Sequence, residues 1–452
     1  MNNFRPIDRD TGFLLPPSVD EWLPERHLAR FVVEVVAGLD LRSMTGSYRG
    51  SGEAPYHPEL LLGLIIYGYA SGVFSSRKLE RATYDSVAFR FIAANQHPDH
   101  DTIAVFRRRF LAQIAPLFAQ VLCVAREMGV LQLGTVALDG TKIHANACRH
   151  SALSYEHADR IEAQLQAEVA DLLAKAEATD QADVPDGMSV PAELARREQR
   201  LAALARAKAT IEARAKERHA FERAEHEAKL KAREAKTAAT GKKPRGRPPA
   251  APVEGPLPTD QVNLTDQGSR IMPVAGGGFE QCYNAQAAVT AGLLVIAADV
   301  VQAPNDKQQL EPMLGKLADL PDELGTTDAL LADNGYFSES NVNACAAAGI
   351  APLIAMGREA HHPTLDERFA EAPEPPTDPT PLEAMQHRLK TPEGKKLYAL
   401  RKQMPEPVFG IIKSVLGFRQ FLLRGLDNVR GEWTLVTMAW NIKRMFVLAG
   451  AN

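Results

Sequence analysis

Three acidic residues stand beside apolar stretches, in positions where a carboxylate can do chemistry. Asp139 follows the apolar residues of "TVALDG", Asp333 follows those of "ALLADNG", and Glu406 precedes those of "PEPVFGIIK". We expect each aspartate to end a buried strand and the glutamate to begin an amphipathic helix, because a rigid element can hold a carboxylate as a metal ligand. Each also has a simpler explanation, since Asp before Gly is common in turns and Glu favours the first turn of a helix. The interpretation therefore depends on all three occurring together in this order.

The ligand chemistry of this trio indicates a hard divalent cation. Carboxylate oxygens without a nearby His or Cys cluster favour Mg²⁺ or Mn²⁺. Such a trio can hold two ions about 3.5–4 Å apart, one activating water or a 3′-hydroxyl and the other stabilising the leaving oxygen of a phosphodiester. One carboxylate must bridge both ions. We expect Asp139 to do so, with Asp333 and Glu406 each completing one side.

Other polar residues near these stretches are not assigned to the site. His144 and Asn146 fit strand-edge positions as well as a place near the site or its substrate. His361 and His362 fit a loop better than a metal site, and Asn334 fits either a turn or a place supporting Asp333.

The chain has no feature of a secreted or membrane protein. Its first residues, "MNNFRPIDRD", lack a basic and then apolar signal pattern, and the longest apolar run, residues 60–74, is shorter than the ~20 residues that span a bilayer. We expect that run to form a buried helix. The sequence has no Cys-x-x-Cys, which argues against a disulfide framework or a zinc ribbon and fits a reducing cytoplasm; the four cysteines are Cys123, Cys148, Cys282 and Cys345.

Residues 1 to about 130 are expected to form a helical N-terminal domain. Apolar residues recur at a helical spacing at Ile103, Phe106, Phe110 and Ile114. Short helices with the basic "RRR" of residues 107–109 fit a helix-turn-helix-like DNA module, and they also fit a plain helical bundle with surface arginines.

The remainder has an α/β order interrupted by a helical stretch. Strands are expected at "TVALD" (or a hairpin there), "QCYNAQAAVT", "LLVIAADVVQ", "ALLAD" and "IAPLIAMG", with helices between and after them. Residues 151 to about 240 are helical in period on both sides of "TDQADVPDGMSVP", which predicts a two-helix hairpin inserted into the α/β domain.

The inserted segment is basic, although the whole chain has a net charge of -4. From Arg196 to Arg247 there are 17 Lys and Arg against 7 Asp and Glu, a local charge of +10. A basic segment on an acidic protein suggests a polyanion partner, and a solvated charged helix is the simpler explanation.

Several stretches together resemble the bacterial insertion-sequence transposases of the DDE class. They are "VALDGTKIHANA", "LLADNGYFSE" and "YALRKQMPEPVFGIIK", supported by "NLTDQGSRIM", "YNAQAAV" and the closing "GFRQFLLRGLDNVRGEW" and "AWNIKRM". "HPELLLGLIIYGYASGVFSSRKLE" and "PDHDTIAVFRRRF" resemble the N-terminal domain of that group. The resemblance implies a ribonuclease-H-like mixed-sheet core, formed by residues 131–150 and 261–452, with residues 151–260 as a helical basic insertion.

Carried over by position, the resemblance implies that Asp139, Asp333 and Glu406 are the catalytic, metal-binding triad. The third block of the family has Tyr, two residues, Arg, three residues, Glu, six residues, Lys. Tyr398 and Lys413 keep that spacing, and we expect Lys413 to share a helical face with Glu406. We expect Tyr398, Lys413 and the basic residues Arg401 and Lys402 to bind DNA, with Arg401 and Lys402 facing backbone phosphate. Four residues separate Arg401 from Glu406, and three separate Lys402 from it, so either basic residue can take the role of the arginine.

The stretch "KKPRGRPPA" of residues 242–250 resembles the core of an AT-hook. The glycine lets the backbone approach the groove floor, the prolines favour an extended chain, and Arg245 and Arg247 would enter the narrow minor groove of A·T-rich DNA. The alternative is a basic flexible linker that attracts phosphate without specificity.

The resemblance implies a cytoplasmic, nucleoid-associated DNA transposase. Such an enzyme binds the terminal inverted repeats of its element, cleaves strands with Mg²⁺ or Mn²⁺ and joins them to target DNA. Two ends must meet, so a homodimer or a larger synaptic complex is expected, with no membrane involved. Two alternatives stay open: a metal-dependent nuclease or resolvase that does not join strands, and a DNA-binding protein derived from a transposase.

Overall fold

The computed structural model describes residues 18–48, 55–179, 190–242, 246–274, 276–357, 374 and 376–450. The chain divides into two compact units. The first, here called the core unit, comprises Met1–Asn146, Met272–Gly278 and Cys282–Asn452; the second, the hairpin unit, comprises Ala147–Ile271 and Phe279–Gln281.

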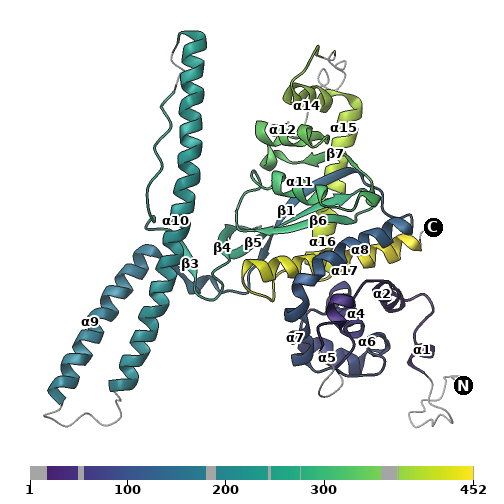
Figure 1. The fold of residues 1–452 in the computed structure, drawn as a ribbon, viewed down its shortest axis with the longest axis horizontal. Coiled ribbons are helices and arrows are strands. Elements are labelled where there is room, and N and C mark those ends of the chain that lie inside the picture. The colour runs from purple at the N-terminus through teal and green to yellow at the C-terminus, as the bar shows by residue number, and fades with distance from the viewer. Residues whose placement is uncertain are drawn as a thin grey trace, which may run out of the picture. The chain divides into compact units, whose positions relative to one another are not determined.

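A mixed sheet forms the centre of the core unit, which confirms the predicted α/β class (Figure 1). Strand β1 (Gly134–His144) pairs antiparallel with β5 (Phe279–Thr290) and parallel with β7 (Thr327–Ala332). Strand β6 (Val295–Val301) pairs antiparallel with β5, and β8 (Ala351–Ile354) pairs parallel with β7. Strand β4 (Arg270–Pro273) is also hydrogen-bonded to β5. The stretch expected to be a strand or a hairpin is therefore one long strand, β1.

Helix α17 (Leu426–Ala449) holds the sheet to the helices around it. It contacts β6 as well as α4 (Pro58–Ser71) and α8 (Ile114–Glu127). The buried Trp433 donates its indole N–H to the carbonyl of Gln286 at 2.9 Å. The buried Asn441 amide accepts from the Val295 N–H at 2.8 Å and donates to the Val295 carbonyl at 2.7 Å. A helix side chain thus satisfies strand backbone groups that would otherwise be buried without partners.

The described N-terminal residues, 18–48 and 55–128, are mainly helical, as predicted, and helices among them pack on α17. Helix α4 is buried along most of its length, as expected for the apolar run of residues 60–74. Within it, the Tyr69 hydroxyl donates to the buried carboxylate of Glu432 at 2.9 Å and accepts from the Arg107 guanidinium at 3.1 Å. Glu432 also accepts the N–H groups of Leu422 at 2.9 Å and Leu423 at 3.0 Å. This polar cluster connects three segments that are far apart in the chain.

Among the described residues, one helical run, His100–Glu127, is long and apolar enough to cross a membrane, and the bent pair of α4 and α5 (Ser76–Asp85) meets the same test only when joined. Ile103, Phe106 and Phe110 of that run are buried in the core unit, as expected of core helices in a folded domain.

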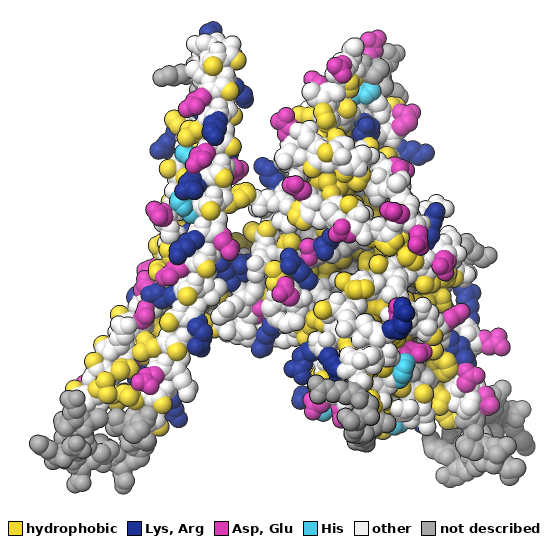
Figure 2. Space-filling view, viewed as in Figure 1, with side chains coloured by type: hydrophobic (Ala, Val, Ile, Leu, Met, Phe, Trp, Pro, Cys, Tyr) yellow, Lys and Arg dark blue, Asp and Glu magenta, His cyan; other side chains and the backbone are white. Residues whose placement is uncertain are grey.

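The hairpin unit contains α9 (Tyr155–Thr179) and the long α10 (Val190–Thr240), the two helices expected from the periodicity of this stretch. They pack through a small apolar core that includes Leu165, Leu204 and Ile211. Beyond this core, basic and acidic side chains alternate along α10 (Figure 2), and pairs such as Lys229 with Glu225 at 3.1 Å neutralise part of the local charge.

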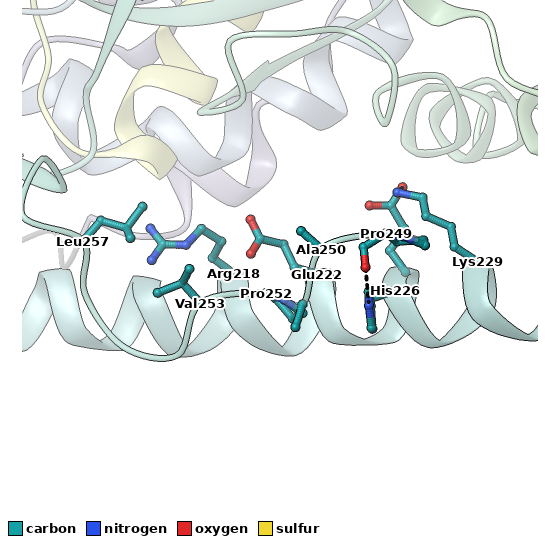
Figure 3. A pocket seen from close by; sticks show the side chains of 11 residues that line it. Arg218, Glu222, His226, Lys229, Pro249, Ala250, Pro252, Val253 and Leu257 are labelled. Carbon is teal, nitrogen blue, oxygen red and sulfur yellow. Dashed lines mark hydrogen bonds and ion pairs between the residues drawn. The ribbon is translucent and has the colours of Figure 1, made fainter. Parts of the chain in front are cut away.

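The chain that follows α10 returns along it and forms a groove of about 350 Å³ (Figure 3). One guanidinium nitrogen of Arg218 donates to both carboxylate oxygens of Asp260, each at 2.7 Å. Another donates to the carbonyl of Gly255 at 2.9 Å. His226 lies 3.2 Å from the carbonyl of Pro249, the contact dashed in Figure 3.

The remaining described elements connect these parts. They are α1 (Val19–Trp22), α2 (Leu28–Ala37), α3 (Arg42–Thr45), α5 (Ser76–Asp85), α6 (Val87–Ile92), α7 (His100–Phe110), β2 (Ala152–Ser154), β3 (Gln261–Asn263), α11 (Leu310–Ala318), α12 (Glu339–Ala347), α14 (Pro381–Lys390), α15 (Pro392–Ala399) and α16 (Pro405–Gly410), with short 3₁₀ or π turns η1 (Leu111–Gln113), η2 (Arg149–Ser151), η3 (Asp322–Leu324), η4 (Asn334–Tyr336), η5 (Leu400–Gln403) and η6 (Ile411–Val415).

Candidate active site

Asp139 lies in the middle of β1, so the expectation that it ends a strand was wrong. Pairing with β5 continues past it, from Asp139 opposite Ala287 to His144 opposite Cys282. Its side chain is 18% exposed, and its Oδ1 accepts the N–H of Gly140 at 2.8 Å. A carboxylate held in mid-strand is more rigidly placed than one at a strand end.

Asp333 directly follows β7, as expected, and lies beside β1. In the parallel register Ala137 is opposite Leu331, so Asp139 and Asp333 each stand two residues further along neighbouring strands. The half-buried Asp333 begins the short turn η4, where its Oδ1 accepts the N–H of Gly335 at 2.8 Å. Parallel pairing in register therefore places the two carboxylates near each other, toward the carboxyl ends of the neighbouring strands β1 and β7.

Glu406 lies in the first turn of helix α16, which contacts β1, and its side chain is 51% exposed. Arg401, in the 3₁₀ turn η5 before α16, joins it to Asp139. The Arg401 guanidinium lies 4.0 Å from Oδ2 of Asp139 and 3.7 Å from Oε1 of Glu406, and its side chain is only 12% exposed. Lys402, the other basic residue considered for this place, is exposed.

Tyr398 and Lys413 contact the strands that carry the two aspartates. The Tyr398 hydroxyl donates to the carbonyl of Ala332, the residue before Asp333, at 3.4 Å. The Lys413 ammonium donates to Oγ1 of Thr141 at 3.0 Å and to the Lys142 carbonyl at 3.1 Å, both on β1. Helix α16 ends at Gly410 and continues as the π turn η6, so the single regular helix expected from Glu406 to Lys413 was wrong. π turns are rare and often occur at functional sites.

A second set of polar side chains, on the face of β1 that carries Gly140 and Lys142, was not anticipated from the sequence. Asp306, between β6 and α11, accepts from the amide groups of Asn284 and Gln286, both at 2.7 Å. Gln286 in turn accepts the hydroxyl of the fully buried Tyr336. Gly140 lies against this set, since a Cβ atom there would be 2.3 Å from Nε2 of Gln286 and 2.7 Å from Oδ1 of Asp306.

The electrostatics of the site are dominated by buried negative charge. Burial, with smaller contributions from the charges of Asp333 and Asp306, raises the pKa of Asp139 to about 7, although the Gly140 N–H and Arg401 lower it. In the described part of the chain, no three His, Cys, Asp or Glu side chains are close enough together to hold a metal ion as they stand. The donor chemistry still fits a hard divalent cation, because the converging groups are carboxylate oxygens with an excess of negative charge.

The other residues singled out from the sequence lie elsewhere. His144 continues β1 by pairing its backbone with Arg419 and Phe421, and the Asn146 amide donates to the carbonyl of Leu422 at 2.8 Å, so both have structural roles. The Asn334 amide faces the carbonyls of Ala355 and Met356 at 3.2 Å. Arg247 is exposed in the hairpin unit, while Arg245, His361 and His362 lie outside the described residues.

Comparison with known proteins gives two family matches. Residues 17–109 match a family described as "Transposase domain (DUF772)", and residues 377–446 match one described as "Transposase DDE domain". The second match includes Tyr398, Arg401, Glu406 and Lys413; Asp139 and Asp333 lie outside both. No curated protein and no solved structure matches the chain.

The close packing at Gly140 can be tested by a single added methyl group. We expect Gly140→Ala to lower the free energy of unfolding by about 1–3 kcal/mol, because the added carbon displaces the hydrogen-bonded Gln286 and Asp306 side chains. Gly315→Ala is the matched control: it lies in α11 with open space around it, and we expect it to stabilise by about 0.4–1 kcal/mol. Urea denaturation measures both, and an unchanged stability of Gly140→Ala would contradict this account of the packing.

Proposed function

From the two transposase domains that identify the chain as a DDE-type insertion-sequence transposase, we propose that it binds the terminal inverted repeats of its element and catalyses metal-dependent strand cleavage and strand transfer. The observation that carries this proposal is the placement of Asp139 and Asp333 two residues beyond an in-register pair of parallel strands, with Arg401 joining Asp139 to Glu406. That residues so far apart in the chain are brought to one end of the sheet supports a shared role in phosphodiester chemistry.

We further propose that the sheet is the ribonuclease-H-like core implied by the sequence. Its central strand β1 has an antiparallel partner on one side and a parallel partner on the other, which supports that assignment. In this proposal residues 131–150 and 261–452 form the catalytic domain, residues 1–130 bind the DNA ends and residues 151–260 form an insertion.

Asp139, Asp333 and Glu406 would hold one or two Mg²⁺ or Mn²⁺ ions, with Asp139 shared. Such ions activate the attacking oxygen and stabilise the leaving oxygen of a phosphodiester. The chain supplies the rest. Strands β1 and β7 fix the two aspartates, Tyr398 holds the end of β7, and half-exposed Glu406 enters from α16.

Arg401 fits the role of the arginine in the third block of the family better than Lys402 does. It is nearly buried between two carboxylates, where its charge offsets theirs, and we propose that it contacts the backbone phosphate beside the scissile bond. Lys413, anchored on β1, and Tyr398 would contact the same strand of DNA. Exposed Lys402 would add only general attraction to phosphate.

The proposed partner is double-stranded DNA, as the two ends of the element and as the target. The synaptic complex would contain two or more copies of the chain and form in the cytoplasm. Joining of 3′ ends to target DNA distinguishes this function from that of a nuclease or resolvase, which yields cleaved ends only. Metal-dependent nicking excludes a DNA-binding protein that has lost its chemistry.

Removal of the triad carboxylates should separate cleavage from binding. We expect Asp139→Ala, Asp333→Ala and Glu406→Ala each to reduce Mg²⁺- or Mn²⁺-dependent cleavage of an element end by on the order of 10³-fold or more while leaving end binding largely intact. Asp322→Ala, which removes an exposed carboxylate from η3, serves as the control for charge. Full cleavage by any triad variant would remove that residue from the catalytic role.

Arg401→Ala and Lys402→Ala remove the same charge at neighbouring positions. We expect Arg401→Ala to reduce cleavage by roughly 10²-fold, because a group that stabilises charge at the reacting phosphate is lost, and Lys402→Ala to reduce it only a few-fold. Arg401→Ala and Lys413→Ala should each lower the salt slope of DNA binding by about one unit, similarly for all sequences. A larger effect of Lys402→Ala would reverse the assignment, and a loss confined to one DNA sequence would indicate base recognition instead.

We also propose that the stretch from Lys242 to Ala250 binds A·T-rich minor groove. Gly246 has a φ of +104°, a conformation that favours glycine, and its carbonyl accepts from Arg233 of α10 at 3.1 Å, which leaves Arg247 exposed beside a tethered backbone.

Replacement of Arg245 and Arg247 by Ala should weaken binding to A·T-rich duplex more than to G·C-rich duplex, by about 1–3 kcal/mol in total. The sharper variant replaces both by Lys, which keeps the charge but loses affinity in a narrow groove, since an ammonium is more strongly hydrated. Fluorescence anisotropy with two duplexes of equal length measures this. Wild-type affinity of the Lys variant for both duplexes would identify the stretch as a basic linker.

A further inference from the structure

Two exposed cations, Arg77 and Lys78, stand in the first turn of helix α5 and form no ion pair with a described carboxylate. The Ser75 side chain, at the N-cap, makes no hydrogen bond to that turn. Glu80, the nearest acidic residue along the chain, is occupied by His100, whose Nδ1 lies 2.8 Å from its carboxylate. Positive charge is therefore available to a ligand at this end of α5.

The arginines of the "RRR" stretch in α7, by contrast, mostly hold the fold. The Arg107 guanidinium donates to the carbonyl of Phe74, in the loop before α5, at 3.2 Å. Arg109 donates to the carbonyl of Ser47 at 2.7 Å. Of the three arginines, Arg108 is exposed and has no partner among the described residues. A DNA-binding surface on these helices would therefore draw much of its free charge from the start of α5.

The loop that leads into α5 lies against the chain that leaves the candidate active site. A Cβ atom on Gly72, whose φ is +83°, would be 2.8 Å from the carbonyl oxygen of Leu416. The rings of Phe74 and Phe418 meet edge to face, with their centroids 5.2 Å apart. Both contacts lie within the core unit, so the start of α5 is held beside residues 416–418.

A third exposed cation, Arg419, comes next on that segment. Its Nε donates to the carbonyl of Lys413 at 3.0 Å, and no described carboxylate forms an ion pair with its guanidinium. Its own carbonyl accepts the N–H of His144, the last residue of β1, at 3.1 Å. Lys413 contacts Thr141, which shares one face of β1 with Asp139 because side chains alternate along a strand. Cations are thus placed at intervals between the strand of Asp139 and the start of α5.

We propose that Arg77, Lys78 and Arg419 bind backbone phosphates of the element end, on a path that leads from the N-terminal helices to Lys413 and the triad. This inference rests on the proposed function and deepens it, since it assigns a surface that holds the DNA between the recognised sequence and the cleaved bond. Duplex DNA fits this surface because it carries one negative charge per about 1.7 Å of helix axis, and exposed cations without acidic partners complement such a polyanion.

The salt dependence of DNA binding tests the charge of this path, by fluorescence anisotropy with a duplex that carries the inverted repeat of the element. We expect the double variant Arg77→Ala/Lys78→Ala to lower the salt slope by about two units and to weaken binding about tenfold or more, and Arg419→Ala to lower the slope by about one unit. Arg77→Lys keeps the charge and should keep the slope. Arg126→Ala is the matched control, because this exposed arginine ends α8, before the opposite end of β1, and we expect the wild-type slope.

Neutral methylphosphonate linkages, placed one at a time along the same duplex, test the order of the contacts. Each linkage removes the charge of one phosphate, so a variant that has already lost its contact there becomes insensitive to the linkage. We expect Arg419→Ala to become insensitive at phosphates nearer the cleaved bond, and Arg77→Ala/Lys78→Ala at phosphates further into the repeat.

The outcomes against the inference are distinct from those against the proposed function. Wild-type slopes and an unchanged methylphosphonate pattern in the variants, with the wild type cleaving the element end, overturn the inference and leave the proposed function standing. Lower slopes without insensitivity at particular phosphates also overturn the path, because the three residues then attract DNA only from a distance. The expected slopes and pattern in a chain that cleaves no DNA with Mg²⁺ or Mn²⁺ support the path and contradict the proposed catalysis.

Discussion

The pairing of β1 with strands of opposite direction on its two edges is the constraint from which the site follows. Its antiparallel partner β5 supplies Asn284 and Gln286, and its parallel partner β7 ends at Asp333. Because side chains alternate along a strand, Asp139 and Ala287 share one face of the sheet, whereas Gln286 and Asn284, opposite Gly140 and Lys142, share the other; a shift of one residue in this register would exchange the faces. The buried contacts of α17 with β5 and β6, through Trp433 and Asn441, hold the sheet in which both registers are set.

Arg401 lies between Asp139 and Glu406 and supplies positive charge beside both carboxylates. The guanidinium lies 4.0 Å from the Asp139 carboxylate and lowers its pKa. Burial, which is the largest influence, and the charge of Asp333 outweigh it, so the pKa of Asp139 is raised to about 7. Under the proposed function, bound metal ions and the DNA phosphate would change the balance between the carboxylates and Arg401 that the free protein has.

Much of this organisation could be predicted from local sequence, and the failures share one physical cause. The apolar runs before Asp139 and Asp333 predict strands, and the periodicity of residues 151–240 predicts the helical hairpin, because both patterns are local. The position of Asp139 in mid-strand depends on pairing with β5, which local pattern does not contain. Asp306 stands in the polar stretch "QAPNDKQQL", typical of a turn before a helix, so only its tertiary neighbours distinguish it. The π turn at Lys413 likewise reflects contacts with Thr141 and Lys142.

The cluster of Tyr69, Arg107 and Glu432 makes the N-terminal helices part of the same compact unit as the sheet. Glu432 also accepts the backbone N–H groups of Leu422 and Leu423. These residues directly follow residues 419–421, whose backbone is hydrogen-bonded to the end of β1. A buried carboxylate shared in this way resists hinge bending, since any opening would expose a charge and three of its donors at once. If the helices recognise a DNA end, the rigid unit fixes the distance from the recognised sequence to the active site. The number of base pairs between that sequence and the cleaved bond would then be constant.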